Sequence, residues 1–219
     1  MPTPTKIKRF GVLGSGEVGQ TLAKGLKTHG YQVRIGTRTP AKLADFTRST
    51  GIEAGSFADV ARWGEALVLA VLGEAAMEVL TTIGAASLGG KPILDTTNAL
   101  SHEPPEQGVL KTFTGPNESL LERMQQAYPQ AHFVKAFNSV GSALMVNPKI
   151  PSGRPTMFYC GNDAGAKALA ASVIEQFGWE GADMGGAIAA RAIEPLAVLW
   201  CIPGFLQNDW THAFRVVRP

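Results

Sequence analysis

One glycine-rich turn near the start of the chain constrains its fold more than any other stretch. Residues 6–13 are apolar and β-rich, whereas residues 20–29 have the apolar spacing of a helix. The turn between them carries the pattern G-x-G-x-x-G, at Gly14, Gly16 and Gly19. Such glycines permit a tight turn, a close approach by a pyrophosphate and close helix packing. The pattern predicts a dinucleotide-binding turn, and the alternative is a glycine-rich turn without a ligand.

The end of the second predicted strand, residues 31–36, indicates which dinucleotide binds. An NAD site places Asp or Glu there to accept a hydrogen bond from the ribose 2′-hydroxyl. Between the glycine-rich turn and Asp45 this chain has no acidic residue, but it has Thr37, Arg38 and Lys42. A guanidinium gives a phosphate a planar pair of hydrogen bonds, and an ammonium adds a point charge. These residues favour NADP over NAD, although an exposed basic loop would look the same.

Farther along the chain, apolar β-rich stretches alternate with helical ones, which is typical of a doubly wound α/β fold with a mostly parallel sheet. Six strands with right-handed crossovers would complete a Rossmann-type sheet near residue 140. We therefore expect an NADP-binding domain over residues 1–140 and a small C-terminal α/β extension over residues 141–219. The expected strands are 6–13, 31–36, 52–57, 65–72, 92–95, 132–139, 156–160 and 179–183, and the expected helices are 20–29, 41–49, 59–63, 74–86, 118–127, 164–177 and 187–201.

Residues that follow predicted strands are expected at the edge of the sheet where ligands bind. Val71 and Leu72 end the most apolar strand, so they are candidates to line a ribose. The polar residues 96–98 follow the next strand, and they either face the ligand or cap a loop. Residues 101–117, rich in Pro and Gly, predict a lid or a mobile loop.

Composition argues against several other partners. The net charge of +2 comes without the basic, aromatic-rich face that nucleic-acid binding requires. Residues 66–72 are too short to cross a bilayer, and charges and prolines interrupt residues 188–205, so we expect a buried or interface helix and no membrane partner. The N-terminus lacks the apolar core of a signal peptide. Cys160 and Cys201 lie far apart, which favours buried thiols, a reducing cytoplasmic location and no metal site.

Several motifs together resemble one family over nearly the whole chain. In order they are Gly14-Ser15-Gly16-Glu17-Val18-Gly19, Gly36-Thr37-Arg38, Asp95-Thr96-Thr97-Asn98, Val134-Lys135-Ala136-Phe137-Asn138 and Ile193-Glu194-Pro195-Leu196-Ala197-x-x-Trp200. The chain resembles the NADPH-dependent reductases grouped with the coenzyme F-420-dependent NADP oxidoreductases. The first motifs are shared with many Rossmann enzymes, whereas the later ones are more specific and look like the bacterial branch.

This resemblance implies hydride exchange between NADP(H) and a planar small-molecule acceptor, such as the deazaflavin coenzyme F-420 or a flavin. Some relatives reduce ferric complexes instead. By matching position, the resemblance also assigns roles to residues of this chain. Ser15, Gly16, Glu17 and Val18 would hold the pyrophosphate, Thr37, Arg38 and Lys42 would hold the 2′-phosphate, and Val71, Asn98, Ala136 and Asn138 would lie near the ribose and the nicotinamide.

The chain shows no strong acid–base cluster, which fits a reaction in which two ring systems carry the chemistry. His102 is interpreted as a solvated loop residue and His132 as structural. Lys135 is either a paired strand lysine or a catalytic group. Arg191 and Glu194 have helical spacing, which predicts a local ion pair.

Two other functions stay open on sequence grounds. One is reduction of a small carbonyl or imine substrate, which would need a proton donor beside the nicotinamide. The other is a non-catalytic module that senses the NADP redox state. The apolar C-terminal helix is expected to close the pocket, and to pack inward or form a homodimer.

Overall fold

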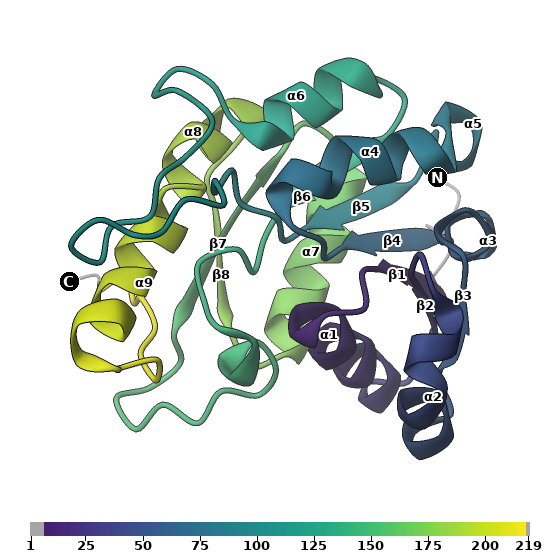
Figure 1. The fold of residues 1–219 in the computed structure, drawn as a ribbon, viewed down its shortest axis with the longest axis horizontal. Coiled ribbons are helices and arrows are strands. Elements are labelled where there is room, and N and C mark those ends of the chain that lie inside the picture. Colours follow the sequence, from purple (N-terminus) through teal and green to yellow (C-terminus); the bar gives the residue numbers. More distant parts are fainter. Residues whose placement is uncertain (1–6, 218–219) are drawn as a thin grey trace.

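Short apolar runs buried on both faces pair side by side, as strands of a parallel sheet do. The computed structural model describes residues 7–217. Its strands are β1 (Arg9–Leu13), β2 (Gln32–Gly36), β3 (Glu53–Gly55), β4 (Ala66–Leu69), β5 (Pro92–Asp95), β6 (His132–Lys135), β7 (Thr156–Gly161) and β8 (Glu180–Asp183). The described residues form one eight-stranded sheet in the order β3-β2-β1-β4-β5-β6-β7-β8 (Figure 1). Its pairings are parallel apart from β6 with β7, which confirms the predicted doubly wound α/β fold.

Helices cover both faces of the sheet and divide the core in two. They are α1 (Glu17–Thr28), η1 (Pro40–Leu43), α2 (Ala44–Thr50), α3 (Phe57–Trp63), α4 (Gly73–Ile83), α5 (Ala85–Leu88), α6 (Leu120–Ala127), η2 (Ser142–Leu144), α7 (Ala164–Gln176), η3 (Ala187–Ala189), α8 (Ala190–Ile193) and α9 (Leu196–Gln207). Leu26 of α1 and Ile174 of α7 belong to one hydrophobic cluster, whereas Leu80 of α4 and Met124 of α6 belong to the other. On the α1–α7 face, residues from the start and the end of the chain therefore pack into one hydrophobic cluster.

Several predicted elements have other bounds in the structure: the strand predicted over 65–72 ends at Leu69, and the helix predicted over 74–86 is divided at Gly84 into α4 and α5. The strand predicted to reach residue 139 ends at Lys135, because Phe137 adopts a left-handed conformation with φ of 58°. The helix predicted over 187–201 is divided into η3, α8 and α9, and α8 and α9 separate at Pro195, which has no N–H group to continue the helix. The helix predicted over 41–49 begins as the 3-10 turn η1, and Thr39, which precedes this turn, makes no side-chain capping bond.

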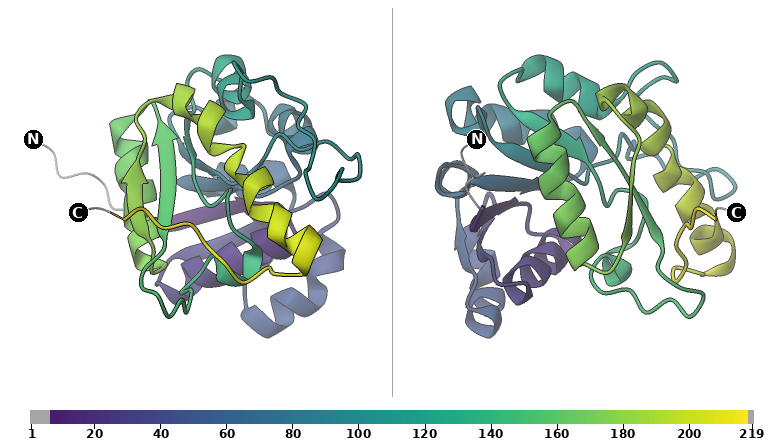
Figure 2. Two further views of the ribbon diagram at one scale, coloured as in Figure 1. Left: turned by 90° about the vertical axis from the view of Figure 1, so that its left-hand side faces the viewer. Right: turned by 180° about the vertical axis from the view of Figure 1, so that it is seen from behind.

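Residues after 140 extend the same sheet and do not form a separate layer. β7 meets β6 through two residue pairs, Val134 with Gly161 and Lys135 with Cys160, and then pairs with β8. Trp179, which is 1% exposed, donates its indole N–H to the Met145 carbonyl at 2.9 Å. Figure 2 shows that α9 lies at the end of the molecule away from α2.

The C-terminal helical segment is unusually apolar. Residues 187–207 are, within the described part of the chain, the segment long and apolar enough by composition to cross a membrane, with a mean hydropathy of 1.4. Their most apolar 18-residue window is 33% buried. Glu194 and Trp200 are 5% and 6% exposed, so polar and aromatic side chains anchor this segment to the rest of the domain.

Candidate active site

The glycine-rich turn has the geometry that its sequence predicts. A Cβ atom on Gly14, where φ is 133°, would lie 2.0 Å from the Ala70 carbonyl oxygen, and one on Gly19 would lie 2.0 Å from the Gly14 oxygen. Gly16 has no neighbouring atom within 4 Å of such a Cβ. Gly14 and Gly19 are therefore required by packing, whereas Gly16 leaves open space before the N-terminus of α1. A helix N-terminus that faces open space is suited to an anion.

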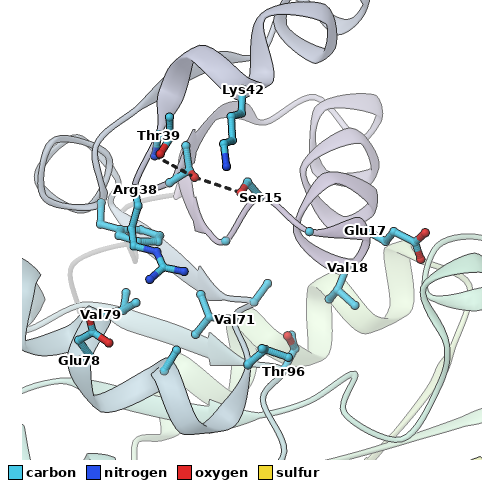
Figure 3. A pocket seen from close by; sticks show the side chains of 17 residues that line it. Ser15, Glu17, Val18, Arg38, Thr39, Lys42, Val71, Glu78, Val79 and Thr96 are labelled. Atoms are coloured by element: carbon cyan, nitrogen blue, oxygen red, sulfur yellow. Dashed lines mark hydrogen bonds between the residues drawn. The ribbon is translucent and has the colours of Figure 1, made fainter. Parts of the chain in front are cut away.

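A cavity of about 560 Å³, here called the main cavity, opens in front of this turn (Figure 3). It brings together most of the residues that the sequence assigns to the cofactor. The predicted residues that line it are Gly14, Ser15, Gly16, Glu17, Val18, Thr37, Arg38, Lys42, Val71 and Leu72. Figure 3 shows the Glu17 carboxylate turned away from the centre. Its Oε2 atom accepts a hydrogen bond from Ser142 Oγ at 3.4 Å.

One end of the main cavity is polar and basic. The hydroxyl groups of Ser15 and Thr37 lie 3.1 Å apart, and this contact joins the glycine-rich turn to the end of β2. Arg38 and Lys42 point into the cavity in Figure 3. Neither side chain forms an ion pair with any residue between 7 and 217. Two cations without a protein counter-ion are a fitting environment for a phosphate.

The opposite wall comes from α4, whose residues are not among the predicted site residues. Ala75, Glu78 and Val79 line the main cavity from this helix, together with Phe57 and Ala70. The spacing of the three α4 residues, at i, i+3 and i+4, places them on one helical face. Because α4 follows β4, the strand paired beside β1, this spacing was the signal in the sequence.

Four predicted site residues lie outside the main cavity. Gly19 packs under the turn, and Ala136 is buried, with its N–H group donating to the Asp95 carbonyl at 3.0 Å. Asn98 and Asn138 are joined to each other: Asn98 Nδ2 donates to the Asn138 carbonyl at 2.9 Å, and Asn138 Nδ2 donates to Asn98 Oδ1 at 3.0 Å. The asparagine pair follows β5 and β6, close in sequence to Thr96 on the cavity wall.

A second, smaller cavity of about 250 Å³ is lined by residues farther along the same chain segment. Thr96 lines the main cavity, and Ala99 lines the smaller one, here called the loop cavity. Residues 96–99 therefore form a strip between the two. The loop of residues 101–117 contributes to the other wall, and its end is held where Phe113 N–H donates to the Ala99 carbonyl at 2.9 Å. The loop cavity is lined by Ala99, Leu100, Thr112, Thr114, Gly115, Pro116, Glu118, Arg191, Glu194 and Pro195.

A fully buried ion network lies beneath this strip. Lys135 Nζ is 2.5 Å from Asp95 Oδ2 and 3.0 Å from Glu194 Oε1, and it donates to the Thr97 carbonyl at 2.7 Å. Burial by itself lowers the pKa of Lys135, but the Asp95 and Glu194 charges outweigh it and raise that pKa above its usual value. Lys135 is therefore a charged, paired residue with no exposed surface.

The predicted local ion pair between Arg191 and Glu194 is wrong. Arg191 instead forms a two-point contact with Glu122 of α6, with Nη2 2.8 Å from Oε1 and Nε 2.9 Å from Oε2. Glu194 turns inward and accepts hydrogen bonds from the N–H groups of Leu120 and Leu121, at 2.9 and 3.0 Å. The backbone of Glu194 is still helical, so the pair fails because each side chain has a partner on another element, Glu122 for Arg191 and Lys135 with the start of α6 for Glu194.

The histidines lie away from the main cavity. His102 is 75% exposed and its Nε2 atom lies 2.5 Å from Glu74 Oε2, as expected of a solvated loop residue. His132 begins β6, with Nδ1 3.8 Å from Asp163 Oδ2. Cys160 is buried and Cys201 partly buried, and both are free thiols. Burial raises the pKa of the Cys160 thiol to about 12.

The parallel sheet, the glycine-rich turn and the basic cavity define a Rossmann-type dinucleotide-binding protein. Comparisons with known proteins identify the family within this class. Residues 9–99 match the family described as NADP oxidoreductase, coenzyme F-420-dependent. A proposed F-420-dependent NADP-reductase from Arthrobacter sp. FB24 is 33% identical, covers 97% of this chain and 100% of its own, and superposes with a TM-score of 0.90. The chain belongs to the coenzyme F-420-dependent NADP oxidoreductase family.

Two more distant relatives have different descriptions. Metalloreductase STEAP3 of Rattus norvegicus is 28% identical over 208 residues, which is 93% of this chain. The chain spans only 40% of the length of that protein. An imine reductase from Aspergillus terreus in complex with NADPH4 shares the fold, with 17% identity, a TM-score of 0.67, and coverage of 93% of this chain and 64% of its own.

Proposed function

We propose that this NADP-dependent oxidoreductase family member transfers a hydride between NADP(H) and a planar acceptor, such as the deazaflavin coenzyme F-420 or a flavin. The observation that carries the proposal is the pair of cavities separated by residues 96–99. The main cavity has the size and the basic end that suit a dinucleotide phosphate. The loop cavity is lined by Ala99, three residues after Thr96 of the main cavity, and we assign it to a second ligand.

The residues of the main cavity fit NADP(H) at several points. Gly16 leaves the space that a side chain would fill, and Arg38 and Lys42 offer cationic groups at the 2′-phosphate end. Bound NADPH would supply the hydride. The chain then supplies distance, orientation and exclusion of water, and we assign the bonded pair Asn98 and Asn138 to the nicotinamide side of the site.

The burial and pairing of Lys135 support this reaction over the reduction of a carbonyl or imine. Such a substrate would need a proton donor beside the nicotinamide. Lys135 is fully buried, is held by two carboxylates and a carbonyl, and does not line either cavity. A ring-to-ring hydride transfer makes no such demand on the chain, because the electrons move between two conjugated systems.

The proposal is tested by anaerobic NADPH oxidation with coenzyme F-420, FMN and a ferric chelate offered in parallel. Turnover with coenzyme F-420 alone identifies a deazaflavin reductase, and turnover with FMN or iron identifies a flavin or ferric reductase. If NADPH binds tightly but none of the three is reduced, the proposal fails. A screen of carbonyl and imine substrates then separates a reductase of that kind from a non-catalytic NADP(H) sensor.

We also propose that the protein is a homodimer that buries the outer face of α9. Leu199, Phe205 and Leu206 are 53%, 44% and 59% exposed on this helix. Burying large apolar side chains of this kind favours association. The double variant Leu199→Glu and Leu206→Glu is expected to be a monomer by light scattering while the wild type is a dimer. A wild-type monomer at high concentration would contradict the proposal.

A further inference from the structure

Two buried connections join the strip of residues 96–99 to α8. In the first, Asn138 Nδ2 donates both to Asn98 Oδ1, at 3.0 Å, and to the Ile193 carbonyl, at 2.9 Å. These two acceptors fix the orientation of the Asn138 amide. Its Oδ1 atom is buried and has no hydrogen-bond partner in the described part of the chain. An unpaired buried acceptor costs stability, so the arrangement favours geometry over stability at this position.

In the second connection, Lys135 joins the strip to Glu194. Asp95 Oδ1 accepts from the N–H and hydroxyl groups of Thr97, at 2.9 and 2.7 Å, and Lys135 holds the Thr97 carbonyl. The backbone of Thr97 is therefore fixed at both its N–H and its carbonyl. On its other side Lys135 contacts Glu194, which is also bound to the first two N–H groups of α6. One carboxylate thus connects β6, α6 and the end of α8.

The charges of this network indicate that it positions α8 relative to residues 96–99. A single carboxylate would neutralise Lys135, yet two are buried beside it, 0% and 4% exposed. Burying an additional charge is expensive and seldom increases stability. Part of the cost is offset because Glu194 lies at the positive end of α6. The second carboxylate is explained if its task is to hold α8 at a set distance from the strip.

We propose that Glu194 is a positioning residue for hydride transfer. Through Lys135 and the Thr97 carbonyl it fixes the strip between the main cavity and the loop cavity, so that donor and acceptor keep the separation that the reaction needs. Reacting atoms must approach to about 3–3.5 Å, and a misplacement of about 1 Å can cost about 100-fold in rate. The inference rests on the proposed function, because it assigns the donor and the acceptor to the two cavities.

The test compares Glu194→Gln with the control Glu122→Gln. Glu122 joins the same two helices, but through the outer contact with Arg191. Glu194→Gln leaves Lys135 and Asp95 as a balanced pair, so the variant is expected to fold. We expect its NADPH Kd to stay within twofold of wild type while kcat falls at least tenfold. The primary isotope effect with NADPH deuterated at the transferred position is expected to rise, because hydride transfer becomes rate-limiting. Glu122→Gln releases Arg191 at the loop cavity but leaves Lys135 and the strip in place, so it is expected to match wild type in NADPH Kd and in the isotope effect.

Each outcome decides the inference. A Glu194→Gln protein with a lower melting temperature but wild-type kcat and isotope effect would show a merely structural role and overturn it. If Glu194→Gln does not fold, Glu194→Asp is the second variant, because it keeps the charge but is one methylene shorter. A wild-type kcat and isotope effect in Glu194→Asp would also overturn the inference. Lack of wild-type turnover with any acceptor would overturn the proposed function and this inference together. Normal turnover in both wild type and variant would overturn the inference alone.

Discussion

At the scale of single residues, the three glycines of the turn have separable tasks. Gly14→Ala is expected to destabilise the protein by about 3 kcal/mol or more, because it combines a positive φ with a 2.0 Å clash. For a chain of this length that lowers the melting temperature by about 6–12 °C. Gly16→Ala is expected to keep the wild-type melting temperature and to weaken NADPH binding at least about tenfold. Calorimetry and fluorescence titration measure the two effects. Equal loss of stability in both variants would contradict this division.

Arg38 is the residue expected to discriminate between the two nicotinamide cofactors. Arg38→Ala is predicted to weaken NADPH binding by about 1.5–3 kcal/mol, as expected for a lost charged hydrogen bond, and to leave NADH binding nearly unchanged. Arg48→Ala is a suitable control, because Arg48 is an exposed arginine paired with Asp45 and lies outside the main cavity. Titration with both cofactors checks the prediction. Equal losses for NADPH and NADH would remove Arg38 from the 2′-phosphate site.

Sequence reasoning located the residues whose role depends on near neighbours in the chain. Gly14, Gly16 and Arg38 could be assigned because a turn and the strand that follows it are local features. The Asn98–Asn138 contact joins residues 40 positions apart, and the Glu194–Leu120 contact joins residues 74 apart. No periodicity in the sequence encodes such pairings, because they depend on how β5, β6, α6 and α8 pack together.

At the scale of elements, Lys135 holds together β5, β6 and the end of α8. Lys135→Met would leave two buried carboxylates without a counter-ion, and it is expected to cost about 3–5 kcal/mol of unfolding free energy. Glu194→Gln is expected to cost less, about 1–3 kcal/mol, because a balanced pair remains. Chemical denaturation measures both values. A smaller loss for Lys135→Met than for Glu194→Gln would show that the network is not charged as described.

The same lysine predicts a pH dependence with a definite sign. Its pKa is raised in the folded state, so its contribution to stability is fully present below the unfolded value of about 10.4 and is lost as pH rises through the folded value. The stability difference between wild type and Lys135→Met should therefore be constant from about pH 7 to 9 and shrink above about pH 10.5. A difference that grows with alkaline pH would contradict the assignment.

Element boundaries show where local rules were sufficient and where they failed. Gly51 ends α2 in the left-handed conformation that a glycine favours, with φ of 64°, and the helix expected over 41–49 ends within one residue of this stop. The end of β6 was not predicted, because Phe137 is an apolar residue that the pattern assigns to a strand. Its left-handed φ depends on the tertiary setting, in which its N–H group contacts the Met157 sulfur at 3.1 Å.

At the scale of the whole molecule, cofactor binding should appear as global stabilisation. A ligand at 100 times its Kd adds about 2.7 kcal/mol to the unfolding free energy. For a chain of this size that corresponds to an increase of about 5–11 °C in melting temperature. We expect NADPH to produce such a shift and NADH at the same concentration to produce a smaller one, by differential scanning fluorimetry. Equal shifts would argue against NADP preference.

The junction between β6 and β7 has a consequence for how such a chain can diversify. Two residue pairs join β6 to β7, and beyond them β7 is paired with β8. The segments that form most of the main cavity come before this junction, whereas α8, which borders the loop cavity, comes after it. Because α1 and α7 share one hydrophobic cluster, mutations in the core of the later part still act on the packing of the earlier strands. Within residues 7–217, the later part contributes Arg191, Glu194 and Pro195 to the loop cavity and no residue to the main cavity, so exchanges at these positions can reshape one cavity wall while the cofactor turn is retained.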